Sequence, residues 1–113
     1  MKHPTVLEVN YADAHQVTLS LHIPADIAYF NGHFPTTPIL AGVVQVDWAL
    51  HFAAEHLELD KNKFTGAPQL KFSQLILPGA TLQLELTYQN GTLRFRYYHE
   101  AGVYSKGKLA VRA

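Results

Sequence analysis

The sequence contains no cysteine and little charge. Without cysteine, the 113-residue chain has no disulfide, thiolate nucleophile or cysteine metal ligand, and a reducing, cytoplasmic location is expected. Basic and acidic residues number nine each, and this zero net charge argues against a nucleic-acid partner, which requires a basic footprint. No apolar run approaches the roughly 20 residues that cross a bilayer, and the N-terminal segment lacks the apolar core of a secretory signal. No membrane role is therefore expected.

The length fits one domain over residues 1–113, and the low charged fraction, 16%, suggests that part of the surface is covered by self-association. Residues 15–23 and 81–88 alternate between apolar and polar side chains, which predicts two strands with one apolar face each. The Asn90-Gly91 pair predicts a tight hairpin turn. Further strands are expected at residues 6–9, 69–77, 93–99 and 103–111, the last with a possible interruption at Gly107.

Residues 40–57 (LAGVVQVDWALHFAAEHL) form the best helix candidate, because they contain no proline and are apolar nearly all round. A helix of that kind is expected to be buried. Strands with one apolar face could wrap around it, and a second copy of the sheet could help to enclose it. The expected fold class is α+β, an antiparallel sheet wrapped around one long central helix.

Asp47 is an unusual residue in the middle of this helix. Apolar residues precede and follow it at helical spacing, so its carboxylate is expected to be desolvated, where an unpaired charge is costly. Such a group holds a proton or pairs with a partner, as catalytic acids do. A structural aspartate, bonded to the backbone or facing a wet cavity, is the alternative.

His33 lies in the segment Asn31-Gly32-His33-Phe34-Pro35, where glycine and proline hold the backbone. Histidine exchanges a proton near neutral pH, which suits general acid–base catalysis. Taken alone, the segment is better explained as an ordinary proline-rich turn, because loops of this composition are common. Gly42, near the start of the helix, offers backbone N–H groups that could polarise a thioester carbonyl. Every helix has such an end, so this signal is weak by itself.

The segment FNGHFPTTPILAGVVQVDWAL resembles the active-site segment of the bacterial 3-hydroxyacyl-[acyl-carrier-protein] dehydratases. Gly32 to Pro35 reads GHFP, Pro38 matches a second proline, and Asp47 follows His33 by fourteen residues, as the acid does in that family. The resemblance implies a hotdog fold and a dimer with two shared active sites. It also implies that His33 removes the C2 proton, Asp47 assists loss of the 3-hydroxyl as water, and the Gly42 N–H binds the carbonyl.

The resemblance further implies substrate contacts at Gly42, Phe34, Val43 and His51. The family's Pro-Gly pair is Ala41-Gly42 here, and His51 stands where glutamine is common. The amino-acid sequence around Asp47 is similar to that of the small dehydratases of aryl-polyene pathways. No metal or cofactor is implied, since the phosphopantetheine arm belongs to the substrate.

The expected partners are an acyl carrier protein and a second subunit, which forms a homodimer or higher homo-oligomer, with a heterodimer also possible. Basic residues in the second half of the chain could meet the acidic carrier, or could be scattered surface charges. These are Lys61, Lys63, Lys71, Arg94, Arg96, Lys106 and Lys108. Two alternatives to the dehydratase remain: an acyl-thioester hydrolase of the same fold, which generally lacks the GHFP histidine, and a non-catalytic acyl-thioester-binding subunit.

Overall fold

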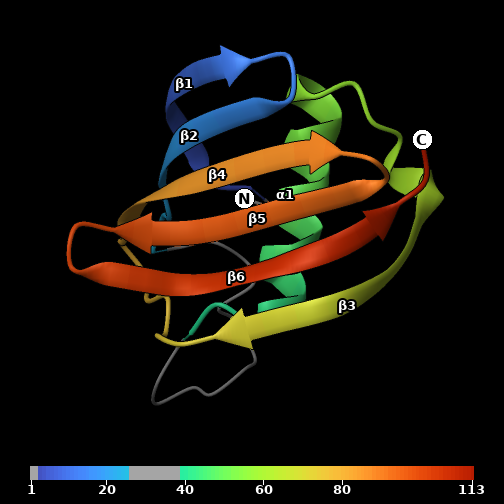
Figure 1. Ribbon diagram of the computed structural model, residues 1–113. Coiled ribbons are helices and arrows are strands. Elements are labelled where there is room, and N and C mark those ends of the chain that lie inside the picture. Colours follow the sequence, from blue (N-terminus) through green and yellow to red (C-terminus); the bar gives the residue numbers. More distant parts are fainter. Residues whose placement is uncertain (1–2, 26–38) are drawn as a thin grey trace.

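The computed structural model describes residues 3–25 and 39–113, and within them one long helix lies against a six-stranded sheet (Figure 1). The strands are β1 (Thr5–Asp13), β2 (Gln16–His22), β3 (Phe64–Phe72), β4 (Thr81–Gln89), β5 (Thr92–His99) and β6 (Gly102–Val111). Helix α1 (Gly42–His56) and the 3-10 turn η2 (Lys61–Lys63) lie between β2 and β3 in the sequence.

The sheet is antiparallel throughout and its strand order is β1-β2-β4-β5-β6-β3. Figure 1 shows it curving around α1, with β1 and β3 at its two edges. This arrangement confirms the predicted α+β architecture. No helix in the described ranges is long and apolar enough to cross a membrane.

Alternation along the central strands builds the core. In β2, Val17, Leu19 and Leu21 are fully buried, and the residues between them are partly exposed on the opposite face. Leu82, Leu84 and Leu86 of β4, with Leu93, Phe95 and Tyr97 of β5, complete this apolar surface. Each fully buried leucine stabilises the fold by roughly 1.5–3 kcal/mol through the hydrophobic effect.

The predicted hairpin is confirmed, since Asn90 and Gly91 join β4 to β5 with φ of 54° and 75°. Positive φ at both central residues is the geometry that such a two-residue turn needs. The prediction of an interruption at Gly107 was wrong, because β6 continues through it. A Cβ at this position would meet the Gln69 carbonyl oxygen at 2.6 Å, so glycine allows β3 to approach closely.

Two other strands differ from their predicted bounds. β1 runs from Thr5 to Asp13, longer than residues 6–9. β3 covers Phe64–Phe72 rather than residues 69–77. Pro68 lies inside β3, where the register with β6 shifts between Gly66 and Gln69. Proline is tolerated there because β3 is an edge strand with an irregular ladder.

Helix α1 begins at Gly42 and ends at His56, slightly inside the predicted residues 40–57. Its sheet-facing side is buried at Gln45, Trp48, Ala49, Phe52 and Ala53. On the opposite side, among the residues that the structure describes, Val43, Asp47 and Glu55 are exposed. The prediction of a helix buried all round was therefore wrong for a single chain.

Candidate functional site

Three predicted site residues form one stripe on the uncovered side of α1. Val43, Asp47 and His51 are spaced by four residues, so they succeed one another along one helix face. Val43 is 76% exposed and Asp47 is also exposed, whereas His51 is partly buried. The structure thus brings these three side chains together.

The expectation that Asp47 is desolvated was wrong for the chain by itself. Of the four apolar neighbours at helical spacing, only Leu50 is buried, while Val44 and Ala54 are partly exposed and Val43 points into solvent. The cause is the orientation of the helix, which turns Trp48 and Phe52 to the sheet and Asp47 away from it. Burial of this carboxylate therefore requires atoms from outside the described chain.

The start of α1 supplies free backbone donors beside the stripe. Ala41 is the N-cap in an extended conformation, and its carbonyl accepts from the N–H groups of Val44 (3.1 Å) and Gln45 (3.2 Å). Gly42 and Val43 precede these donors, so their N–H groups have no acceptor within the helix. Together with the helix dipole, these groups favour negative charge at this end of α1.

Phe72 packs over Gly42, a contact that sequence reasoning missed. A Cβ at Gly42 would lie 2.8 Å from Cζ of the Phe72 ring. Phe72 ends β3 and is 46% exposed, so it lies at the helix start while still facing solvent. Only the pairing of β3 with β6 places it there, and no local signal could have found it.

A buried polar network fastens the first turns of α1 to the sheet. The hydroxyl of Tyr97 in β5 donates to the Gln45 carbonyl at 2.7 Å, and that of Ser105 in β6 donates to Gln45 Oε1 at 2.6 Å. Gln45 Nε2 donates in turn to the Leu40 carbonyl at 3.1 Å. Burial, and then the nearby charge of Asp47, raise the pKa of Tyr97 well above 10, so its hydroxyl stays a donor. A glutamine on the apolar face of a helix was the signal available in the sequence.

A second polar cluster surrounds His51 at the far end of the stripe. His51 Nε2 lies 3.0 Å from Oε1 of Glu55, one helical turn further along α1. The His3 ring stacks on His51 with centroids 4.0 Å apart, and His56 Nδ1 lies 2.6 Å from the Tyr11 hydroxyl. Burial, and then the proximity of His51, lower the pKa of His3. Within residues 3–25 and 39–113, no group of three or more histidine, aspartate or glutamate side chains could hold a metal ion.

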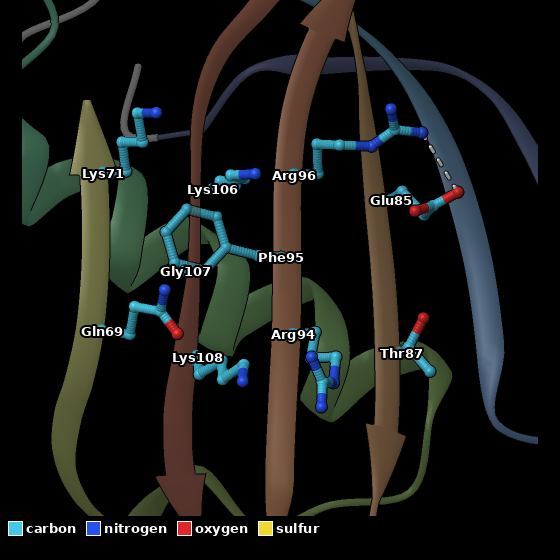
Figure 2. Close-up of a pocket in the computed structure, with 10 residues that line it drawn as sticks. All are labelled: Gln69, Lys71, Glu85, Thr87, Arg94, Phe95, Arg96, Lys106, Gly107 and Lys108. Atoms are coloured by element: carbon cyan, nitrogen blue, oxygen red, sulfur yellow. Dashed lines mark hydrogen bonds and ion pairs between the residues drawn. The ribbon is translucent and has the colours of Figure 1, made fainter. Parts of the chain in front are cut away.

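The opposite face of the sheet carries many of the basic residues singled out from the sequence. An open hollow of about 300 Å³ lies over β3, β6, β5 and β4. Figure 2 shows the residues that line it. Its basic lining residues are Lys71, Arg94, Arg96, Lys106 and Lys108. Glu85 is the acidic residue among the described lining, and it lies 3.4 Å from Arg96.

His33 and Phe34 lie outside the described residues, as does the rest of the GHFP segment. The described chain resumes at residue 39, directly before the helix start. The Leu40 N–H there donates to the Ile76 carbonyl at 2.9 Å. The pairing of His33 with Asp47 thus remains a prediction.

Comparison with known proteins gives one family match and many relatives. Residues 9–108 match the family described as ApeI-like, ApeI dehydratase. The chain is 34% identical over 114 residues to the 3-hydroxyacyl-[acyl-carrier-protein] dehydratase FabZ of Streptococcus uberis, covering 93% of this chain and 76% of that protein. With FabZ of Acetivibrio thermocellus the identity is 39% over 66 residues, which span 53% of this chain but only 45% of the relative.

Solved structures agree with these matches. The dehydratase heterocomplex ApeI:P from Xenorhabdus doucetiae includes a chain that superposes with a TM-score of 0.89 at 29% identity, covering 98% of this chain and 99% of that one. An uncharacterized protein from Erwinia carotovora subsp. atroseptica gives 0.80 at 35% identity, with coverages of 96% and 94%. The dehydratase domain of the polyketide PpsC from Mycobacterium tuberculosis gives 0.70 at 17% identity, covering 98% of this chain and 44% of that one, and shows the fold alone. The predicted hotdog fold is confirmed.

Proposed function

Because this chain belongs to the ApeI-like dehydratase family, we propose that it dehydrates 3-hydroxyacyl thioesters, carried by an acyl carrier protein, to trans-2-enoyl thioesters. The observation that supports this most directly is Asp47 on the uncovered face of α1, fourteen residues after His33 and close to the free N–H groups of the helix start. A base, an acid and a donor for a developing oxyanion are the groups that the reaction needs.

The proposed reaction balances without a cofactor. His33 takes the C2 proton, the C3–oxygen bond breaks as the C2–C3 double bond forms, and Asp47 delivers a proton so that hydroxide leaves as water. The Gly42 N–H stabilises the negative charge that develops on the thioester oxygen. His33 afterwards returns its proton through solvent, which restores the acid. In the reverse direction the same groups hydrate the enoyl product.

Asp47 can act as an acid only if its surroundings change. A carboxylic acid keeps a proton near neutral pH where burial disfavours its charged form. The exposed position of Asp47 therefore supports a second subunit that covers the stripe of α1. We propose a two-fold dimer in which His33 of each chain faces Asp47 of the other.

Edge strand β3 supports such an assembly. Among the described residues, no strand pairs with its outer side. It carries half-exposed Phe64, Leu70 and Phe72, with Leu75 (60%) and Leu77 (49%) exposed just after it. An exposed apolar edge pairs readily with another strand. A second copy joining at β3 would extend the sheet and lie beside the start of α1, which Phe72 contacts.

A non-catalytic partner role is the second candidate, because the similar ApeI:P structure is a dehydratase heterocomplex. In that case the second subunit would be a different hotdog chain. The presence of both His33 and Asp47 in this chain favours catalysis.

We further propose that the basic sheet face binds the acidic carrier protein. Lys106 lies directly opposite both Arg96 and Lys71 in the ladders, and Lys108 lies opposite Arg94 (Figure 2). Like charges in direct cross-strand positions destabilise a sheet. An acidic partner would relieve that repulsion. Charges scattered at random over the surface would not face one another across neighbouring strands in this way.

The basic face can be tested separately from the chemistry. Arg94→Glu and Lys108→Glu should raise KM several-fold for a carrier-bound substrate and leave KM unchanged for the same acyl group on a short pantetheine-like thioester. Lys63→Glu, on η2 and outside the hollow, is the matched control. Equal effects on both substrates would refute docking at this face.

The proposed reaction is tested with a panel of 3-hydroxyacyl carrier proteins, read by mass spectrometry. Loss of one water supports the dehydratase, whereas release of a free acid would identify a hydrolase. His33→Ala and Asp47→Asn should each lower turnover by roughly 100-fold or more. Dimers that combine one chain of each variant should regain about half the wild-type activity, because one of their two sites is intact. An inactive wild type that becomes active only with a second hotdog chain would favour the heterodimer.

A further inference from the structure

Gln45 is a polar residue on the buried side of α1, and the proposed reaction assigns it no role. It is 3% exposed and lies between Trp48 and the helix start, where an apolar side chain would satisfy packing. Every described contact of its polar atoms instead holds a different part of the molecule. The side chain accepts from Ser105 in β6 and donates to Leu40, and the main-chain carbonyl accepts from Tyr97 in β5.

Leu40 is held from two sides by these contacts. Its carbonyl accepts from Gln45 Nε2 at 3.1 Å, and its N–H donates to the Ile76 carbonyl at 2.9 Å. Leu40 lies between the segment that contains His33 and the helix that carries Asp47. The peptide groups on either side of Leu40 are therefore bonded, one to Ile76 and the other to Gln45, which fixes the described chain directly before the helix.

We propose that Gln45, held by Tyr97 and Ser105, is a positioning residue that fixes the start of α1 relative to the sheet, and with it the Gly42 N–H and Asp47. This inference rests on the proposed dehydratase function. Gln45 touches no reacting atom. It acts through Leu40 and the first helical turn.

A buried network in which every polar group is hydrogen-bonded adds little net stability. Its main effect is to favour a single arrangement of the side chains and backbone that it joins. Among the described residues, no buried side-chain nitrogen or oxygen lacks a hydrogen-bond partner. Removing one member leaves its partner unsatisfied, and the helix start can then shift to satisfy it. Catalytic groups misplaced by about 1 Å lose on the order of 100-fold in rate.

The test compares Gln45→Met, which keeps the size and loses the hydrogen bonds, with Ser105→Ala and Ser105→Thr. We expect Gln45→Met to fold and dimerise, with kcat lowered roughly tenfold or more and KM little changed. Ser105→Ala should show a smaller loss of kcat, and Ser105→Thr should restore it because threonine keeps the hydroxyl. Leu86→Ala, a core substitution in β4 outside the network, controls for lost stability.

Hydrogen exchange of the Leu40 and Val44 amides, which are bonded to the Ile76 and Ala41 carbonyls, supplies a readout that does not depend on activity. Exchange should accelerate in Gln45→Met and stay unchanged in Leu86→Ala. The proposal is overturned if Gln45→Met keeps kcat within twofold of the wild type, if Leu86→Ala loses as much kcat at equal Tm, or if exchange does not change. An inactive wild type would refute the proposed function, and the exchange result would still decide whether Gln45 holds the helix start.

Discussion

The His3 ring stacks on His51, which belongs to the Val43–Asp47–His51 stripe. This contact leads to a prediction about the pKa of His3. Burial, and then His51, lower the pKa of His3 below 6.5. The folded state thus binds this proton less tightly than the unfolded chain. Its contribution to stability is present above pH 6.5 and is lost as the pH falls from 6.5 through the folded pKa.

A titration of the imidazole signals by NMR checks this prediction. His3 should titrate below 6.5, and His51→Gln should move its pKa part of the way back, since burial remains. His22→Gln is the control, because His22 bonds Thr81 and lies on the opposite face of the sheet. A His3 pKa at or above 6.5 in the wild type would contradict the stacked arrangement.

For Tyr97 the pKa shifts in the opposite direction, so its effect on stability is expected at alkaline pH. Burial, and then Asp47, raise its pKa well above 10, so the folded state binds this proton more tightly than the unfolded chain. Its contribution is present below pH 10 and is lost as the pH rises above it. Tyr97→Phe should cost about 1 kcal/mol at neutral pH, the usual net value of a hydrogen bond. Urea unfolding at about pH 8 and about pH 11 should show a flatter decline in stability for this variant than for the wild type.

At the scale of elements, two glycines allow close approaches of different kinds. A Cβ at Gly42 meets the end of the half-exposed Phe72 ring, which can rotate away. A Cβ at Gly107 meets the Gln69 backbone oxygen at 2.6 Å and the Phe95 ring at 2.8 Å, which cannot both move. Gly107 therefore sets the spacing of β3 and β6, whereas Gly42 sets the position of one ring.

Denaturant unfolding of two alanine variants tests this difference. Gly107→Ala should destabilise the chain by about 1–3 kcal/mol, the usual cost of overpacking. Gly42→Ala should cost less than about 0.5 kcal/mol, since the strain is relieved at the surface. The ranking would be refuted if Gly42→Ala proved the more destabilising.

At the scale of the whole molecule, the exposed stripe and edge strand predict an oligomer. Val43→Glu should leave the chain folded, with stability changed by less than about 0.5 kcal/mol, because Val43 is 76% exposed. It should weaken the dimer, since burying an unpaired charge is costly. Sedimentation of the wild type, of Val43→Glu and of the exposed control Gln89→Glu measures this. A wild type that is monomeric and fully active at micromolar concentration would refute the shared site.

Patterns a few residues long could be read from the sequence. The alternation of β2 and β4 and the Asn90-Gly91 turn predicted those elements closely, because strand period and turn geometry are local properties of the backbone. The central helix was predicted to within two residues at each end. The fourteen-residue spacing of His33 and Asp47 was also visible, and it indicated the family that the comparisons then showed.

Only the tertiary structure decided what surrounds those residues. The pairing of β3 with β6 brings Phe72 against Gly42 and collects the basic side chains on one face. Gln45 meets Tyr97 and Ser105, which lie 52 and 60 positions later. The sheet covers the Trp48 side of α1, and this choice leaves Asp47 exposed. Such contacts depend on which faces pack together across the whole chain, and hydrophobic periodicity alone does not specify that choice.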